Sequence, residues 1–552
     1  MLLPPFPRLL SYAAALAGLL AAAAWAAPDA AYDLGTRREL FADGFLVDRL
    51  SGGAELRLHH PEPREIVLVH DAPWEGNHSL NYSVFRDGDR YRMYYSTTMV
   101  AMQPDPAAPP GAPPVRRQRA PSFCCYAESD DGTRWRKPAL GLVEFGGSRA
   151  NNILFQREQL GALTTEPAAI AVMKDGNPAA PPEARYKAFV LGLVPGDAYR
   201  GLLAYQSPDG IHWRPLQTEP ILTAGSFDGQ NVVFWDAARG RYRAYWRAYY
   251  DPVTGRPAAG FGGLRGFRTG TSADLRHWDE IADLAYPGSP PQHLYTSQVQ
   301  PYPRAPHLYV GFPSRYVEPL QRGSLAEATA PAGPDRTRRW PASLRALPEL
   351  ADRELRAGIS ERFGSALTEG MFMAGRDGVT FRRWDEAFIR PGIERPGTWT
   401  SGQNYLSWPL VETASALAGA PPELSLYGSE SYWTGTSSEA RRYSLRLDGF
   451  VSVWAPYRGG EVVTRPVRFA GRRLTLNFAT SAAGGVQVEI QDLAGRALPG
   501  FAREDCAPLF GDTLERAVAW GPGADLAALA GRPVRLCFVL RDADLYAFQF
   551  QE

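Results

Sequence analysis

Three acidic residues occupy the same relative place in three successive segments of the sequence, each just before a strand-like run. They are Glu75 in "DAPWEGNHSLNY", Glu166 in "LTTEPAAIAV" and Asp228 in "FDGQNVVFW". Cleavage of a glycosidic bond needs two carboxyl groups, one protonated and one ionised. Carboxylates that converge in a half-buried channel push their pKa values apart and provide both states. We therefore expect Asp228 as acid or base, Glu75 as its partner, and Glu166 as a tuning group.

Amide and aromatic side chains stand beside these carboxylates or at matching places in later segments. Such groups suit sugar hydroxyls and sugar faces, and the predicted substrate-binding residues are Asn77, Gln230, Asn231, Tyr295, Gln298, Trp399 and Asn404. Each acidic residue also has an ordinary structural interpretation. Glu75 could be a turn residue, Asp228 the start of an Asp-Gly turn, and Glu166 a cap, so these alternatives stay open.

A heptad repeats along the chain. Its spacing sets the phase of the repeats and so indicates where the inner strands, with these residues before or at their starts, begin. It reads "SPDGIHW" at 207–213, "SDDGTRW" at 129–135, "SADLRHW" at 272–278 and, in a divergent form, "GRDGVTF" at 375–381. Its Asp can accept hydrogen bonds from the amides of its own turn, its Gly supplies a positive φ, and its Trp buries a large ring. Because an active site is needed once and a hairpin is needed in every repeat, we interpret the heptad as structural.

The repeats predict an all-β fold. Four strands per repeat and five repeats specify a five-bladed β-propeller over residues 28–454. The segment "RRELFADGFLVDRL" is expected to close the ring or cover its edge. Two insertions interrupt the rhythm, a Pro/Ala-rich surface loop at 102–121 and a small helical insertion in blade four at 318–369. Residues 455–552 lack the heptad and predict a C-terminal β-sandwich.

Residues 1–27 have the layout of a secretory signal peptide, with one Arg, an alanine-rich apolar run and small residues near Ala24–Ala26. The expected location is therefore secreted or periplasmic in a bacterium, and an uncleaved membrane anchor is the alternative. The 59 basic and 59 acidic residues balance, which argues against a nucleic-acid partner. Export would permit a Cys506–Cys537 bridge, whereas adjacent Cys124 and Cys125 would point to opposite faces of a strand.

Other classes of site fit the sequence poorly. It contains no H-E-x-x-H, C-x-x-C, phosphate loop or G-x-S-x-G motif, and "GFGGLRG" misses the dinucleotide-binding spacing. We therefore predict neither a cofactor nor a catalytic metal. Oxygen ligands in the channel would suit a structural Ca²⁺, although no spacing identifies one.

The chain resembles the five-bladed propeller glycosidases of glycoside hydrolase families 32 and 43, and most closely a secreted bacterial group labelled family-32-like. The segments that carry the resemblance are "RELFADGFLVDRL", "VLVHDAPWEGN", "FDGQNVVFWD", "RAPHLYVGFPSRY" and "RLDGFVSVWAPYRGGEVVTRPVRFAGRRLTLNFATSAAG". The resemblance implies acidic groups in blades one, two and three, where Glu75, Glu166 and Asp228 stand. Asp and Glu are exchanged relative to the families, and the W-x-N-D-P-N-G and R-D-P motifs are absent.

Together these observations predict a secreted glycoside hydrolase that acts on plant or algal oligo- and polysaccharides through carboxylates in the propeller channel. A non-catalytic carbohydrate-binding or scaffold propeller is the alternative. It would bind glycans without releasing reducing ends.

Overall fold

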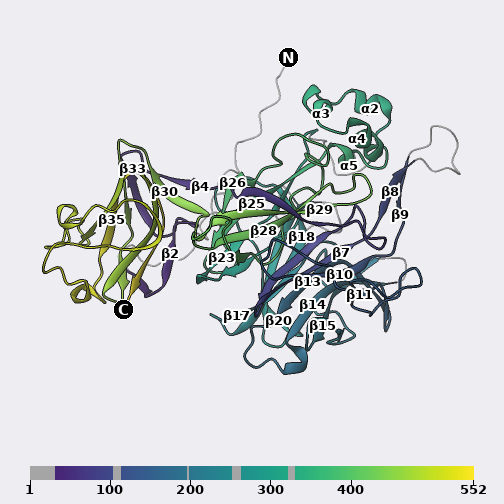
Figure 1. Ribbon diagram of the computed structural model, residues 1–552, viewed down its shortest axis with the longest axis horizontal. Helices are drawn as coiled ribbons and strands as arrows, with labels where there is room; N and C mark the ends of the chain where they lie inside the picture. The colour runs from purple at the N-terminus through teal and green to yellow at the C-terminus, as the bar shows by residue number, and fades with distance from the viewer. Residues whose placement is uncertain (1–30, 104–113, 195–197, 252–262, 321–329) are drawn as a thin grey trace, which may run out of the picture.

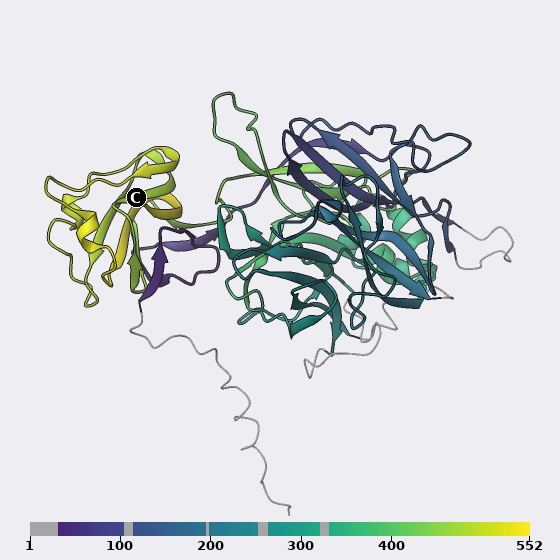
Figure 2. The ribbon, with the colours of Figure 1, turned by 90° about the horizontal axis from the view of Figure 1, so that it is seen from below.

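The computed structural model describes residues 31–103, 114–194, 198–251, 263–320 and 330–552. The predicted signal peptide and the centre of the Pro/Ala-rich loop lie outside these ranges. The molecule consists of two bodies side by side, a large propeller and a smaller C-terminal body (Figures 1 and 2). In the described residues, no helix is long and apolar enough to cross a membrane.

Five antiparallel sheets form the blades of a β-propeller, as the heptad spacing predicts (Figure 1). Blade one contains, from the axis outward, β6 (Leu80–Asp87), β7 (Arg90–Thr97), β10 (Phe123–Ser129) and β11 (Ile153–Gln156). Blade two contains β13 (Leu163–Lys174), β14 (Tyr186–Val194), β15 (Ala198–Ser207) and β16 (Arg214–Pro215), with β12 (Gln159–Leu160) beside β13. Blade three contains β17 (Val232–Asp236), β18 (Arg241–Tyr250), β19 (Leu264–Ser272) and β20 (Trp278–Asp283).

Blade four carries the insertion that the sequence predicts. Its strands are β22 (Gln300–Tyr302), β23 (Ala305–Gly311), β25 (Leu367–Gly375) and β26 (Phe381–Ile389), while β24 (Ser314–Val317) extends the line of β23 and pairs with β21 (His293–Leu294). The helices between β24 and β25 are α2 (Pro334–Arg338), α3 (Ala342–Ala346), α4 (Leu350–Ala357) and α5 (Glu361–Ser365). They gather at one end of the propeller, and α4 touches β8 (Val100–Gln103), which pairs with β9 (Val115–Gln118) (Figure 1).

Blade five closes the ring with a strand from the other end of the chain. Its strands are β27 (Val411–Thr413), β28 (Glu423–Glu430), β29 (Glu439–Arg446) and, outermost, β5 (Glu62–Val69). In β5, Leu68 lies opposite Ala440 of β29. The closing strand that we expected in "RRELFADGFLVDRL" is therefore wrong, because that segment pairs in the C-terminal body and β5, the second strand after it, closes the ring.

The C-terminal body is one eight-stranded sheet around a separate core. It combines β2 (Arg38–Leu40), β3 (Val47–Ser51) and β4 (Glu55–Leu58) with β30 (Val451–Ala455), β31 (Gly460–Thr464), β33 (Arg473–Gln491), β34 (Asp512–Ala517) and β35 (Arg535–Gln551). A two-stranded sheet of β1 (Tyr32–Gly35) and β32 (Val467–Phe469) accompanies it, together with the short helices η2 (Arg503–Asp505) and η3 (Leu526–Leu529). The short helix η1 (Pro182–Ala184) lies between β13 and β14 in blade two. Since β30 pairs with β35 and β4, it does not belong to blade five, where we expected it.

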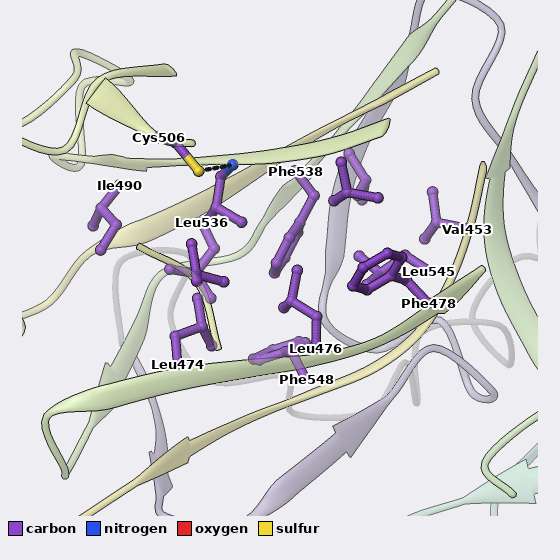
Figure 3. Packing of buried hydrophobic residues seen from close by; sticks show 14 of the residues in the cluster. Val453, Leu474, Leu476, Phe478, Ile490, Cys506, Leu536, Phe538, Leu545 and Phe548 are labelled. Atoms are coloured by element: carbon purple, nitrogen blue, oxygen red, sulfur yellow. Dashed lines mark hydrogen bonds between the residues drawn. The ribbon is translucent and has the colours of Figure 1, made fainter. Parts of the chain in front are cut away.

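The C-terminal core explains why Cys506 and Cys537 do not form the bridge considered above. Both cysteines are free. Cys506 lies in the apolar core with Phe538, and its sulfur accepts a hydrogen bond from the Val488 amide at 3.2 Å (Figure 3). Cys537 precedes Phe538 on β35, so it points to the opposite face of the strand. The β-sandwich that we predicted for residues 455–552 remains a prediction.

The heptad has the structural function that we inferred from its repetition. In the Ser207 copy, the Ser hydroxyl accepts from the Gly210 amide at 2.8 Å, and Asp209 accepts from the amides of Ile211 and His212, both at 2.8 Å. The Trp then packs on a tyrosine of the preceding blade. The rings of Trp213 and Tyr94 lie edge-on with their centroids 6.3 Å apart. The rings of Trp135 and Tyr427 are arranged in the same way, with centroids 5.7 Å apart.

Candidate functional site

The centre of the propeller is closed by two glutamines that the sequence placed in the binding site. Gln230 Nε2 donates to the backbone oxygen of Asn81 at 3.0 Å and to that of Ile170 at 3.1 Å, which joins blade three to blades one and two. Gln298 Nε2 donates to Gln230 Oε1 at 2.6 Å and to the Leu406 oxygen at 2.5 Å, which adds blades four and five. Both side chains are buried. They hold the five blades together and do not face a substrate.

The other predicted amide ligands also bind the protein itself. Asn77 Nδ2 donates to the oxygens of Val100 and Gly435, both at 3.0 Å. Asn231 Nδ2 donates to the Phe227 oxygen at 3.0 Å and to the Gly229 oxygen at 2.7 Å. Asn404 lies between the Arg390 oxygen and the Tyr443 hydroxyl, at 3.1 Å and 2.9 Å. These three residues therefore fix loops and do not offer free amides.

Trp399 is only half-buried and lies beside the helical insertion. Its indole nitrogen donates to the Gly392 oxygen at 2.8 Å, and its backbone oxygen accepts from Arg353 of α4. This residue anchors the insertion to blade five, so its predicted contact with substrate remains a prediction.

Glu75 does not lie open to the channel. Its side chain is fully buried, with Oε2 2.5 Å from the Lys137 ammonium and Oε1 2.5 Å from the Tyr95 hydroxyl. The Ala72 amide also donates to Oε2 at 3.0 Å. Every face of this carboxylate is therefore used within blade one, and we correct the expectation that Glu75 partners Asp228.

Asp228 and Glu166 remain available at the entry ends of two neighbouring inner strands. Asp228 precedes Gln230 by two residues and Glu166 precedes Ile170 by four, so both lie on the same side of the Gln230–Ile170 contact. The side chain of Asp228 is 24% exposed and that of Glu166 is 14% exposed. In the described residues, no contact joins either of them to Glu75.

Each of these two carboxylates has a basic partner. Asp228 forms an ion pair with Arg247 and accepts from the Ser226 hydroxyl at 2.8 Å. Glu166 accepts from the Ala168 amide at 3.0 Å and lies 3.8 Å from Arg157 Nε. A carboxylate against a guanidinium is stabilised in its ionised form, which suits Asp228 to act as a base.

Next to Asp228 lies a group that we call the Tyr–Arg cluster, made of four tyrosines and three arginines from blades three, four and five and from α5. The Tyr295 hydroxyl donates to the Asp228 backbone oxygen at 3.4 Å, and the Tyr295 ring stacks on Tyr405 at 5.0 Å. Burial raises the pKa of Tyr405 and of Tyr432 well above the ordinary value, so both hydroxyls stay protonated. The members are Tyr295, Tyr316, Tyr405, Tyr432, Arg247, Arg265 and Arg362.

Sequence reasoning found Tyr295 and missed the arginines of this cluster. A signal for Arg247 is present in "RYRAYWRAYY", where Arg247 shares a strand face with Tyr245 and Tyr249. A charged residue in the middle of a buried aromatic strand is rare unless it is paired or functional. Arg362 carries no comparable signal, because its approach to Tyr316 depends on how the insertion folds back.

No group of three metal-ligating side chains is found in the part of the chain that the structure describes. Asp228 and Glu166 each have a basic partner, and neither belongs to a group of metal-ligating side chains. The carboxylates, tyrosine hydroxyls and guanidinium groups of this site provide for acid–base chemistry and for the binding of polar or charged groups.

The site belongs to a five-bladed β-propeller with a Tyr–Arg cluster at the entry ends of its inner strands. No family model matches the chain, and no curated protein matches it. Among solved structures, it is similar to a protein described as a glycoside hydrolase, with 14% identity and a TM-score of 0.38 over 69% of this chain and 92% of that one. A glycosyl hydrolase from Bacteroides ovatus gives 12% identity and 0.38 over 70% and 94%. A fructofuranosidase variant from Schwanniomyces occidentalis, complexed with fructosylnystose, gives 11% and 0.34 over 89% and 96%.

Proposed function

We propose that this protein is a glycoside hydrolase whose active site lies at the entry ends of the inner strands of blades two and three. The observation that carries the proposal is the position of Asp228, partly exposed, against a buried guanidinium and beside the hydroxyl of Tyr295. Asp228 acts as the ionised base or nucleophile, and Glu166 of the neighbouring blade, whose 3.8 Å separation from Arg157 Nε is too long for a hydrogen bond, is the acid. Tyrosine hydroxyls of the Tyr–Arg cluster hold sugar hydroxyls.

The closed axis supports a site at the mouth of the propeller. Because Gln230 and Gln298 fill the centre, a glycan can reach Asp228 and Glu166 only from the entry side. The insertion contributes a wall there, since Arg362 of α5 lies over Tyr316 and Phe363 meets Trp433 edge-on at 5.1 Å. A site of this kind would accept part of a chain, such as an oligosaccharide or the end of a polysaccharide, of plant or algal origin.

Reducing-end release from a panel of plant and algal glycans tests the proposal. Asp228→Asn and Glu166→Gln should each lower kcat by about 10²–10⁴-fold with folding intact, because each removes a group that transfers a proton or attacks the sugar. The exposed Glu219→Gln of blade two is the control and should retain full turnover. Unchanged turnover in both site variants would disprove the assignment.

A non-catalytic carbohydrate-binding protein is the second candidate, and one observation favours it. Both Asp228 and Glu166 have arginine partners, so neither is an obvious proton donor in the resting site. This candidate predicts glycan binding by the wild-type protein with no reducing ends released from any glycan of the panel.

We further propose export of the chain by cleavage after residue 27, on the strength of the N-terminal sequence alone. The mature protein would then act outside the cytoplasm, where extended glycans are found. Mass spectrometry of the purified protein tests this, since an N-terminus at residue 1 would show that the segment is retained.

A further inference from the structure

Arg265 of β19 carries a charge that no carboxylate of the described residues neutralises through an ion pair. Its side chain is half-buried and lies 5.9 Å from the centre of the Tyr295 ring and 4.9 Å from that of Tyr316. Nε and Nη1 are buried and have no hydrogen-bond partner. Among the described residues, no carboxylate forms an ion pair with this guanidinium. A buried guanidinium with open donors is costly, so a ligand that completes it gains affinity.

The two other arginines of the cluster also keep donors open. Arg247 is 2% exposed and uses Nη2 for Asp228 and Ser226, while its Nε and Nη1 are unpartnered. Arg362 pairs with Glu318 through Nη2 and leaves Nε unpartnered. Three cations thus face two carboxylates, and the cluster has a positive excess centred on Arg265.

Two tyrosine rings connect the three guanidiniums. Arg247 lies 4.4 Å from the centre of the Tyr295 ring, which Arg265 also approaches. Arg362 lies 5.1 Å from the centre of the Tyr316 ring, which Arg265 shares as well. The arginines therefore form one row beside Asp228, held apart by aromatic rings that contribute cation–π attraction.

The positive excess is also felt by a neighbouring histidine. Burial, together with the charges of Arg265 and Arg362 acting in the same direction, lowers the pKa of His293 to about 4. His293 Nδ1 accepts from the Arg265 backbone amide at 3.3 Å, so the ring is neutral and adds no charge to the row.

We propose that the Tyr–Arg cluster is a subsite for an oxyanion carried by a sugar, so that the substrates are anionic glycans bearing carboxylate or sulfate groups. This inference rests on the proposed function, because it assigns the substrate class of the same site. The planar guanidinium offers paired N–H donors that match the oxygens of a carboxylate or sulfate. Arg265 supplies the unpaired charge, and Arg247 positions Asp228 and adds a second donor edge. The hydroxyls of a neutral sugar could accept from these donors but would leave the positive charge of Arg265 uncompensated.

Binding calorimetry with matched glycans tests the subsite. The probes are a galactan oligosaccharide, the same oligosaccharide bearing sulfate esters, and an oligogalacturonate of equal length. The wild-type protein should bind a charged probe at least about tenfold more tightly than the neutral one, with a preference that weakens as salt rises. The two charged probes show whether sulfate or carboxylate is the preferred oxyanion.

Substitution of Arg265 tests whether this residue causes the preference for charged over neutral glycans. Arg265→Gln should lower the affinity for the charged probe by about 10- to 100-fold and leave that for the neutral galactan unchanged, whereas Arg265→Lys should restore part of the loss. Arg315→Gln is the matched control, since Arg315 lies on β24 next to Tyr316 but is neutralised by Glu369 at 2.5 Å. It should keep the preference intact.

Each outcome separates this inference from the proposed function. Equal affinity of the wild-type protein for charged and neutral galactan would overturn the subsite, and this measurement requires no variant. An equal loss for both probes in Arg265→Gln would also overturn it. Tight, Arg265-dependent binding of a charged glycan that is never cleaved would support the subsite and disprove hydrolysis. Faster cleavage of neutral than of charged glycans would support hydrolysis and overturn the subsite.

Discussion

Gln230 and Gln298 meet at the centre of the propeller through a hydrogen bond of 2.6 Å between their side-chain amides. Their remaining bonds reach backbone oxygens or hydroxyls of the other three blades. No strand or helix occupies the centre of a ring of blades. The hydrogen bonds of this glutamine pair therefore act as the structural hub that connects the five blades. Polar groups are suited to the task, because the inner strands present backbone oxygens that must be satisfied.

Gln230→Leu should therefore lower the free energy of unfolding by about 2–3 kcal/mol. The substitution keeps most of the volume but leaves the oxygens of Asn81 and Ile170 without their donor in a buried place. Urea denaturation of the whole protein measures the loss. Gln156→Leu, at an exposed end of β11, is the control. An unchanged midpoint for Gln230→Leu would show that the pair is not a structural hub.

The propeller could be predicted because its heptad is local. The copies with Asp131, Asp209 and Asp274 fix their hairpins by hydrogen bonds within five residues, and the divergent copy does so through Asp377. The copies therefore mark four of the five blades directly in the sequence. The closing strand β5 could not be predicted in this way. It has no heptad, and its pairing with β29 joins residues more than 350 positions apart, such as Leu68 and Ala440.

The candidate site was only partly predictable for a related reason. Position along an inner strand drew attention to Asp228 and Glu166, but it does not reveal whether a side chain faces solvent or a neighbouring backbone. Gln230 and Asn404 carry amide groups that could bind sugar hydroxyls. In the structure, the Gln230 amide donates to the backbone oxygen of Ile170, and the Asn404 amide donates to that of Arg390. Such a difference depends on long-range packing, which residue type does not encode.

The glycine of the heptad should tolerate alanine poorly. Gly210 has a φ of +79°, and an added Cβ would lie 2.5 Å from the Tyr94 hydroxyl of the preceding blade. Gly210→Ala therefore combines a left-handed backbone, which costs about 1–2 kcal/mol, with overpacking, which costs about 1–3 kcal/mol. Thermal and urea unfolding measure the sum.

Gly240→Ala isolates the backbone contribution. Gly240 has a φ of +63° and nothing within 4 Å of an added Cβ, so only the conformational cost applies. If both variants lose the same stability, the contact between the heptad and Tyr94 contributes nothing.

Stability should fall as the pH drops below about 6.5, and His78 should account for part of the fall. Burial lowers the pKa of His78 to about 3, with a further contribution from Arg116. The unfolded chain thus binds a proton between pH 6.5 and 3 that the folded chain does not bind. Stability from this group is complete above pH 6.5 and is lost toward pH 3, with a slope of up to about 1.4 kcal/mol per pH unit.

His78→Phe should flatten this dependence without loss at pH 7.5. The ring meets Tyr432 edge-on at 5.0 Å, and its Nδ1 has no hydrogen-bond partner, so phenylalanine preserves the packing. Urea denaturation at pH 7.5 and pH 5 gives the slope, with the measurement at pH 7.5 as internal control. His70 and His293, whose pKa values are lowered to about 4, keep part of the slope in the variant. A variant as pH-sensitive as the wild type would contradict the buried, neutral state of His78.

Glu75 offers a test that separates a structural carboxylate from a catalytic one. Its fully buried side chain holds Lys137 at 2.5 Å, and Lys137 also donates to the Val69 oxygen at 2.6 Å, so the pair ties blade one to the ring-closing strand. Glu75→Gln leaves a largely buried ammonium with only the exposed Asp71, 3.4 Å away, as counter-charge and should cost about 3 kcal/mol of unfolding free energy. Lys137→Met should cost a similar amount.

The double variant Glu75→Gln with Lys137→Met should lose clearly less than the sum of the two single losses, because neither charge is then left alone. Turnover on any cleaved glycan, measured well below the unfolding temperature, should stay within about twofold of wild type in Glu75→Gln, since the carboxylate is closed off from Asp228. A variant with wild-type stability and a kcat reduced by about 10²-fold or more would restore Glu75 to the catalytic pair. It would also require blade one to open, because the ion pair with Lys137 must break before this carboxylate can reach a substrate.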